Sequence, residues 1–213
     1  MVAGLDFRPE MIVIVAGVSG SGKTTVGAVL AGCLHWRFAD ADQFHPAANI
    51  EKMQAGIPLT DADRWPWLRA IAAWMDERIA GNESAVITCS ALKRSYRDAL
   101  LGERPEARMI FLAVDREVVA QRLAARHGHF FPAQLLASQF DALEPPQPDE
   151  HVITVIPADD PADTVASIIA LLWPGHAATS SGASGTPAAP GASGTPATPG
   201  ASGTSGGDHE AET

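Results

Sequence analysis

The 213-residue sequence lacks any hydrophobic segment long enough to cross a lipid bilayer. Its longest apolar runs, 11–18 and 85–89, fall far short of the roughly 20 residues that a membrane-spanning helix needs. The start, 1–10, contains acids but no apolar stretch with a cleavage site, so we expect no secretory signal. These absences favour a cytoplasmic protein without a membrane partner.

Cysteine is scarce as well. The two cysteines, Cys33 and Cys89, cannot form a disulfide framework or provide the four ligands of a structural zinc site. We therefore expect two reduced thiols, both buried.

Basic residues are absent from the C-terminal third of the chain. All 15 Lys and Arg residues lie between Arg8 and Arg126, whereas 141–213 contains Asp and Glu but no Lys or Arg. The net charge of the chain is −10. Binding to a nucleic-acid backbone requires many cations that neutralise phosphates, so we expect no nucleic-acid partner. Any anion that the protein binds must be held by individually placed groups.

Large apolar side chains are missing from 175–213, where nearly every residue is Gly, Ala, Ser, Thr or Pro and a nine-residue unit recurs at 182–190 and 191–199. Such a segment cannot offset a chain entropy of about 1–2 kcal/mol per residue. The sequence therefore predicts a disordered tail at 175–213, a short leader at 1–10, and one folded domain at 11–174.

Within 11–174, short β-rich runs alternate with helical patterns. The predicted strands are 11–16, 37–40, 85–89, 108–114 and 151–156. Between them, apolar residues recur with helical spacing, first as Val26, Val29, Leu30, Cys33 and Leu34, and later as Trp65, Leu68, Ala72, Met75 and Ile79. This alternation is typical of an α/β domain, here with a five-stranded parallel sheet flanked by helices.

A glycine-rich loop follows the first predicted strand. Residues 17–24 read GVSGSGKT and match G-x-x-x-x-G-K-[ST] at every fixed position. In such a P-loop, backbone N–H groups and the start of the next helix surround phosphate oxygens, the Lys contacts the outer phosphates, and the Thr hydroxyl ligates Mg²⁺. We predict that ATP binds to Gly17, Val18, Ser19, Gly20, Ser21, Gly22, Lys23 and Thr24.

The carboxylates that this chemistry needs are expected at the end of the second strand. The strand 85–89 ends in Cys89-Ser90 without an acid, so Asp40 and Asp42 are the best source. Residues i and i+2 of an extended chain point the same way, which would place both carboxylates at one cavity. We predict that Asp40 joins Thr24 at Mg²⁺ and that Asp42 accepts a proton from a substrate hydroxyl. An ordinary solvated turn is the alternative.

Further motifs resemble those of the gluconate kinases, a family of P-loop kinases. The matching stretches include 40–46 (DADQFHP), 49–53 (NIEKM), 56–59 (GIPL), 61–64 (DADR), 66–68 (PWL), 89–93 (CSALK), 96–98 (YRD) and 128–131 (GHFF). They follow the order of the family and extend over about 11–173. The resemblance implies an α/β P-loop kinase fold with a helical substrate-binding insertion at about 46–81 and a short lid at about 127–132.

The implied reaction is ATP-dependent phosphorylation of the 6-hydroxyl of D-gluconate. The resemblance suggests Asp42, His45, Arg64, Lys93, Arg97 and His129 for the substrate, Arg122 for the adenine, and Arg126 with Lys23 for the moving phosphoryl group. Lys93 and Arg97 are four residues apart, so they could point two charges at one anion, although a solvated basic face is the alternative. Which cation binds the substrate carboxylate stays open, and a homodimer is plausible by analogy.

Other functions remain as alternatives. A shikimate kinase would share this architecture, but its relatives carry a Gly-rich triplet where this chain has 90–92 (SAL). A nucleoside-monophosphate kinase would need a second Arg set for the acceptor phosphate. A guanine-nucleotide switch is disfavoured because Asn-Lys-x-Asp is absent. A non-catalytic ATP-binding regulator would not need both Asp40 and Asp42.

Overall fold

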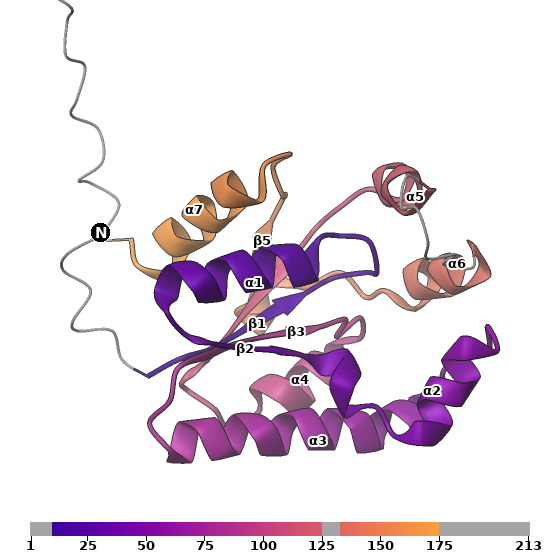
Figure 1. The fold of residues 1–213 in the computed structure, drawn as a ribbon, viewed down its shortest axis with the longest axis horizontal. Coiled ribbons are helices and arrows are strands. Elements are labelled where there is room, and N and C mark those ends of the chain that lie inside the picture. Colours follow the sequence, from indigo (N-terminus) through magenta and orange to yellow (C-terminus); the bar gives the residue numbers. More distant parts are fainter. Residues whose placement is uncertain (1–9, 125–132, 175–213) are drawn as a thin grey trace, which may run out of the picture. The chain divides into compact units, whose positions relative to one another are not determined.

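The computed structural model describes residues 10–124 and 133–174 (Figure 1). Its elements, in chain order, are β1 (Ile12–Ala16), α1 (Lys23–Leu34), β2 (Arg37–Asp40), η1 (Ala41–Phe44), α2 (Ala47–Gln54), α3 (Asp61–Ala80), β3 (Ala85–Cys89), α4 (Arg94–Leu101), β4 (Ala107–Leu112), α5 (Arg116–Ala124), α6 (Ala133–Ala142), η2 (Pro148–Glu150), β5 (Ile153–Val155) and α7 (Pro161–Leu172). The predicted lid and tail, and nearly all of the predicted leader, lie outside the described residues.

The five strands form one parallel sheet in the order β2-β3-β1-β4-β5. This confirms the predicted α/β fold with its five-stranded sheet. The last strand is shorter than predicted, because η2 occupies the residues before it and His151 then adopts a left-handed conformation with φ of 54°. That conformation is incompatible with an extended strand, so pairing begins only at Ile153.

Helices cover both faces of the sheet, with α1 and α7 on one face and α3 and α4 on the other (Figure 1). Strand β1 is fully buried between them. Its side chains alternate: Ile12 and Ile14 pack in the core beneath α3 and α4, whereas Val13 and Val15 pack beneath α1 and α7. Such two-sided burial is typical of parallel sheets.

The buried face of α1 differs from the predicted stripe, and the expectation of two buried cysteines is wrong. Cys33 is exposed, whereas Cys89 is buried. Helix α1 approaches the sheet through Gly27, where a Cβ atom would lie only 2.7 Å from Thr88 Cγ2. Ala31 is buried on the same face, and this close approach turns Cys33 toward solvent.

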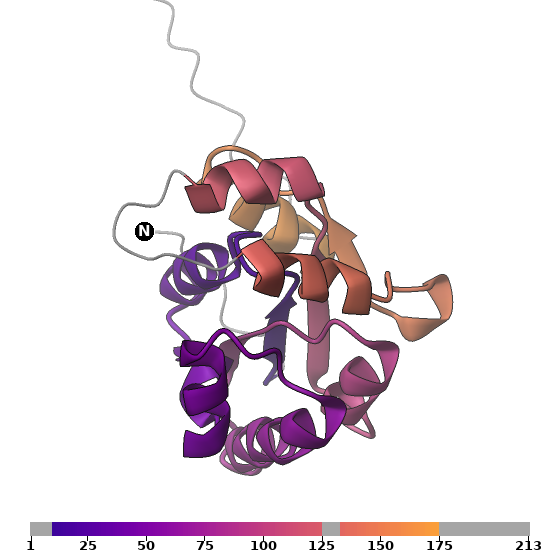
Figure 2. The same cartoon turned by 90° about the vertical axis from the view of Figure 1, so that its right-hand side faces the viewer.

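Helix α3 belongs to the sheet core as much as to the predicted insertion. It begins with a capping box between Thr60 and Asp63, and it buries Trp67, Leu68, Ile71 and Met75. Of the predicted insertion, only α2 and the first turns of α3 lie at the carboxyl end of the strands. They lie opposite α5 and α6 (Figure 2). In the two described ranges, no helix is both long and apolar enough to span a membrane.

Candidate active site

The phosphate loop (17–24) connects β1 to α1 and has a conformation that its glycines permit. Gly17, Gly20 and Gly22 have φ angles of 141°, 81° and 99°. A Cβ atom on Gly17 would lie 2.9 Å from the Leu112 carbonyl oxygen, so no larger residue fits there. Lys23 bends back over the loop and donates from Nζ to the Val18 carbonyl at 2.8 Å.

Thr24 and Asp40, the two predicted magnesium ligands, are in contact. Thr24 Oγ1 donates to Asp40 Oδ2 at 3.0 Å. Mg²⁺ prefers oxygen ligands and usually takes few of them from the protein, so this pair fits it. Within the part of the chain that is described, no group of three His, Cys, Asp or Glu residues could hold a metal ion by itself. A cation here would therefore share its coordination with water and phosphate oxygens.

The reason given for pairing Asp40 with Asp42 is wrong, although the two residues are neighbours in space. Strand β2 ends at Asp40, and Asp42 lies in the 3₁₀ helix η1 rather than on an extended chain. The other carboxylate oxygen of Asp40, Oδ1, accepts a hydrogen bond from the Asp42 backbone N–H at 3.1 Å. Asp40 thus caps η1 and fixes the position of the Asp42 backbone.

The Asp42 carboxylate is open to solvent, with 86% of the side chain exposed, although the surrounding protein partly desolvates it. Partial desolvation by that protein, followed by the negative charge of Asp40, raises the pKa of Asp42, while Lys23 opposes the rise. The exposure leaves room for a ligand. A raised pKa makes Asp42 a better proton acceptor than an ordinary surface aspartate.

His45 lies beside Asp42 and is held on several sides. Its side chain is buried and stacks on Trp67, with ring centres 4.4 Å apart. Burial is the main cause that lowers the pKa of His45 to about 4, so the ring is neutral near pH 7. Asn49 Nδ2 approaches His45 Nδ1 at 3.4 Å and can only donate, so the ring hydrogen belongs on Nε2. That atom lies 4.0 Å from Asp42 Oδ1.

A second polar group lies where α3 meets the start of α4. Lys93 Nζ donates to both carboxylate oxygens of Asp61 at 2.8 Å, and the Tyr96 hydroxyl donates to Asp61 Oδ1. The hydrogen bonds from Lys93 and Tyr96 lower the pKa of Asp61. We call Arg64, Asp61, Lys93 and Tyr96 the open charge network.

Arg64 differs from Lys93 in its partners. Its guanidinium donates to the Tyr96 hydroxyl at 3.5 Å and lies 5.8 Å from the centre of that ring. Among the described residues, no carboxylate lies within ion-pair distance of Arg64. Its charge can therefore meet an added anion without first breaking a salt bridge.

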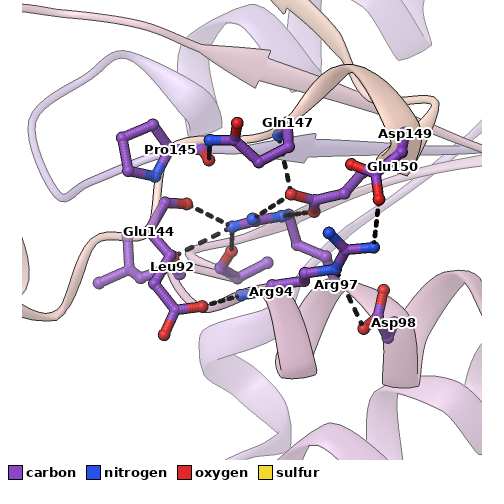
Figure 3. Close-up of polar contacts among 10 residues, drawn as sticks. Leu92, Arg94, Arg97, Asp98, Glu144, Pro145, Gln147, Asp149 and Glu150 are labelled. Carbon is purple, nitrogen blue, oxygen red and sulfur yellow. Dashed lines mark hydrogen bonds and ion pairs between the residues drawn. The ribbon is translucent and has the colours of Figure 1, made fainter.

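Arg97 does not belong to this site, which corrects the prediction that it and Lys93 face one anion. Figure 3 shows Arg97 among its own partners, Leu92, Glu144 and Glu150. Its side chain is fully buried and binds Glu150 through Nε and Nη2 at 2.6 and 2.9 Å. Its Nη1 donates to the carbonyls of Leu92 and Glu144. Lys93 is the N-cap residue of α4, whereas Arg97 lies one turn further into the helix. The two side chains therefore contact different partners. We call Arg97, Glu150 and the carbonyls to which Arg97 donates the sealed charge network.

Three further predicted site residues, Arg122, Arg126 and His129, lie on or after α5. Arg122 lies on α5 and is half-buried. Arg126 and His129 lie outside the described residues, so their predicted roles stay predictions. Sequence reasoning assigned no specific role to Asp61, Asn49 or Tyr96, all of which lie in motifs that it singled out. Their contacts join residues 14 to 35 positions apart, so the sequence alone gives no sign of them.

The chain is similar in sequence to known kinases. Residues 19–134 match the family model for shikimate kinase. The chain is 48% identical to a gluconokinase of Gluconobacter oxydans, over 71% of this chain and 84% of that protein. It is 45% identical to the thermoresistant gluconokinase of Escherichia coli, over 77% and 94% of the two chains.

Solved structures give the same result. A sugar kinase from Janibacter sp. superimposes with a TM-score of 0.72 at 47% identity, covering 77% of this chain and 95% of that one. A gluconokinase from Sinorhizobium meliloti gives 0.66 at 40% identity, covering 80% and 100%. A shikimate kinase from Bacteroides thetaiotaomicron gives 0.54 at 19%, covering 76% and 98%, and so shares the fold alone. The sequence motifs, the sheet topology and these similarities agree that the chain belongs to the gluconokinase family.

Proposed function

We propose that this protein transfers the γ-phosphoryl group of ATP to the 6-hydroxyl of D-gluconate, giving 6-phosphogluconate and ADP. Membership of the gluconokinase family supports the choice of substrate. The observation that carries the chemistry is the contact of Thr24 with Asp40, which brings Asp42 to the end of the phosphate loop.

The nucleotide side of the reaction belongs to the phosphate loop. ATP would place its outer phosphates against the backbone N–H groups of this loop and Lys23. Thr24 and Asp40 would hold Mg²⁺, whose charge would offset that of the phosphate oxygens. Lys23 Nζ, now on the Val18 carbonyl, would reach the phosphates by a change of side-chain rotamer.

Asp42 would accept the proton of the acceptor hydroxyl. As the hydroxyl oxygen forms its bond to the γ-phosphorus, its O–H bond breaks and the proton passes to Asp42. The bond between the γ-phosphorus and the oxygen that bridges the β- and γ-phosphates breaks at the same step, and ADP leaves. The raised pKa of Asp42 favours this transfer. Neutral His45 would donate from Nε2 to a substrate hydroxyl and hold it beside Asp42.

The open charge network would bind the other end of the substrate. Gluconate carries one carboxylate and five hydroxyls, so its site needs one or two cations and many hydrogen-bonding groups. Arg64 is the cation that would bind the carboxylate, because Lys93 is already paired with Asp61. Lys93 and Asp61 would then offer hydrogen bonds to hydroxyls. Arg97 has no place in this proposal.

Several assignments stay predictions. They are the contact of Arg122 with adenine, the action of Arg126 on the phosphoryl group and of His129 on the substrate, the cytoplasmic location, the absence of a nucleic-acid or membrane partner, and a homodimer.

An ADP-release assay with gluconate, shikimate and nucleoside monophosphates in parallel tests the function. We expect turnover with gluconate at least about 10²-fold above the other acceptors, formation of a 6-phosphate ester, and no turnover in Lys23→Ala. Preferred turnover of shikimate would contradict the substrate. Tight ATP binding without turnover of any acceptor would instead favour a non-catalytic regulator.

A further inference from the structure

The side chain of Gln139, on helix α6, forms two hydrogen bonds with the phosphate loop. The Ser19 backbone N–H donates to Gln139 Oε1 at 2.7 Å, and Gln139 Nε2 donates to Ser19 Oγ at 2.9 Å. Because a backbone N–H can only donate, the orientation of the Gln139 amide is fixed by this pair. Both ends of one amide are thus used on a single residue that lies 120 positions away in the sequence.

Helices α5 and α6 pack closely against this part of the loop. Val18 is buried with Val119 of α5 and Leu136 of α6 in a small apolar cluster. A Cβ atom added to Gly20 would lie 3.0 Å from the side chains of Val119 and Leu123. The first half of the phosphate loop is therefore fixed from the side of α5 and α6, away from the sheet core.

We propose that Gln139 is a positioning residue for the nucleotide site. By accepting from the Ser19 N–H, it holds the first half of the loop in the conformation that presents the second half, 20–24, to phosphate oxygens. Glycine-rich loops have many accessible conformations, and a preformed loop loses less entropy when the ligand binds. Gln139 itself needs no contact with ATP, since both of its amide ends are already engaged.

This inference rests on the proposed function only in taking ATP as the ligand of the loop. Ser19 is one of the residues predicted to bind ATP, and in this structure its N–H is directed to Gln139.

The decisive variant is Gln139→Met, which keeps the length of the side chain and removes both hydrogen bonds. We expect the Kd for ATP, measured by calorimetry without acceptor, to rise about tenfold, the size expected when one or two ordinary hydrogen bonds are lost. The KM for ATP should rise with it, whereas the KM for gluconate and the Tm stay close to those of the parent. Gln121→Met, on the exposed face of α5, is the matched control and should leave all four quantities unchanged.

A second variant checks that the two residues act together. Ser19→Ala removes only the hydroxyl partner, so it should raise the Kd for ATP about threefold. Combining it with Gln139→Met should add nothing further, because the contact is already gone.

An unchanged Kd for ATP in Gln139→Met together with a lower Tm would overturn the proposal and leave Gln139 a merely structural residue. An equal rise in the KM for gluconate would also overturn it. The outcome is separate from that of the function, because ATP binding is measured without turnover. If Gln139→Met weakens ATP binding and the parent protein does not phosphorylate gluconate, only the proposed function fails.

Discussion

The two charge networks at α4 use the same kinds of side chain for opposite purposes. Lys93 and Arg97 are four residues apart, and each binds a carboxylate from a distant part of the chain. The Lys93 pair with Asp61 is partly exposed, whereas the Arg97 pair with Glu150 has side-chain exposures of 0% and 1%. The difference shows that residue type and spacing do not by themselves decide whether a cation is sealed inside the fold or open to solvent.

The physical cause is solvent. An exposed ion pair contributes little, about 0–1 kcal/mol, because water competes for both partners. Removing one partner of a buried pair leaves an uncompensated charge in the protein interior, which costs about 3–5 kcal/mol. Arg97 also holds the carbonyls of Leu92 and Glu144, so its loss would leave these acceptors unpaired as well. The open network can therefore exchange its partners at low cost, as the proposed binding of a substrate would require.

The largest effect is expected for Arg97→Met. It should lower the free energy of unfolding by about 3–5 kcal/mol, because Glu150 remains buried without its partner. Urea denaturation measures this value. Lys93→Met is the matched control and should cost less than about 1 kcal/mol. Equal losses in the two variants would break the comparison.

Arg64→Gln sharpens the comparison from the open side. We expect the KM for gluconate to rise by roughly 10- to 100-fold, the cost of losing a charge-assisted hydrogen bond to the carboxylate. The free energy of unfolding should change little, since Arg64 has no carboxylate partner in the described part of the chain. Steady-state kinetics and denaturation of the same preparation measure both. An unchanged KM would remove Arg64 from the site.

The sealed charge network should also contribute to the pH dependence of stability. Arg97 lowers the pKa of Glu150 below its ordinary value of 4.5. A group with a lowered pKa in the folded state stabilises the protein above its ordinary pKa, and this contribution is lost as the pH falls through the folded value. In Glu150→Gln, the free energy of unfolding should therefore depend less on pH below about 4.5. A slope as steep as that of the parent would contradict the assignment.

The smallest effect concerns the thiols, which show the same contrast of exposure. Burial raises the pKa of Cys89 to about 12, so its thiolate is scarce and inaccessible. Cys33 is exposed. A colorimetric thiol titration of the native protein should label Cys33 alone, with activity retained. Both should react after unfolding. Fast labelling of Cys89 in the native protein would contradict its burial.

Much of the fold was predictable because its signals are local. Most of the strands are apolar runs bounded by turn residues. The phosphate loop needs three glycines at the positions where the chain adopts positive φ angles. Fixed spacing after a predicted strand was therefore enough to locate Lys23 and Thr24.

The rest depends on contacts between distant residues. Nothing local distinguishes Lys93 from Arg97, since Glu150, the partner that buries Arg97, lies 53 positions further along the chain. The spacing of Asp40 and Asp42 suggested one extended strand, but the side chain of Asp40 caps a 3₁₀ helix instead. Cys33 fitted the apolar stripe of α1, yet the tight packing of Gly27 against the sheet rotated it outward.

The most direct test of the whole account is the turnover of Asp42→Asn, which keeps the shape of the side chain and removes its ability to accept a proton. We predict that kcat with gluconate falls by at least about 10²-fold, while the Kd for ATP and the free energy of unfolding stay close to those of the parent. A kcat near the parental value would show that the hydroxyl loses its proton elsewhere, and the proposed role of Asp42 would be wrong.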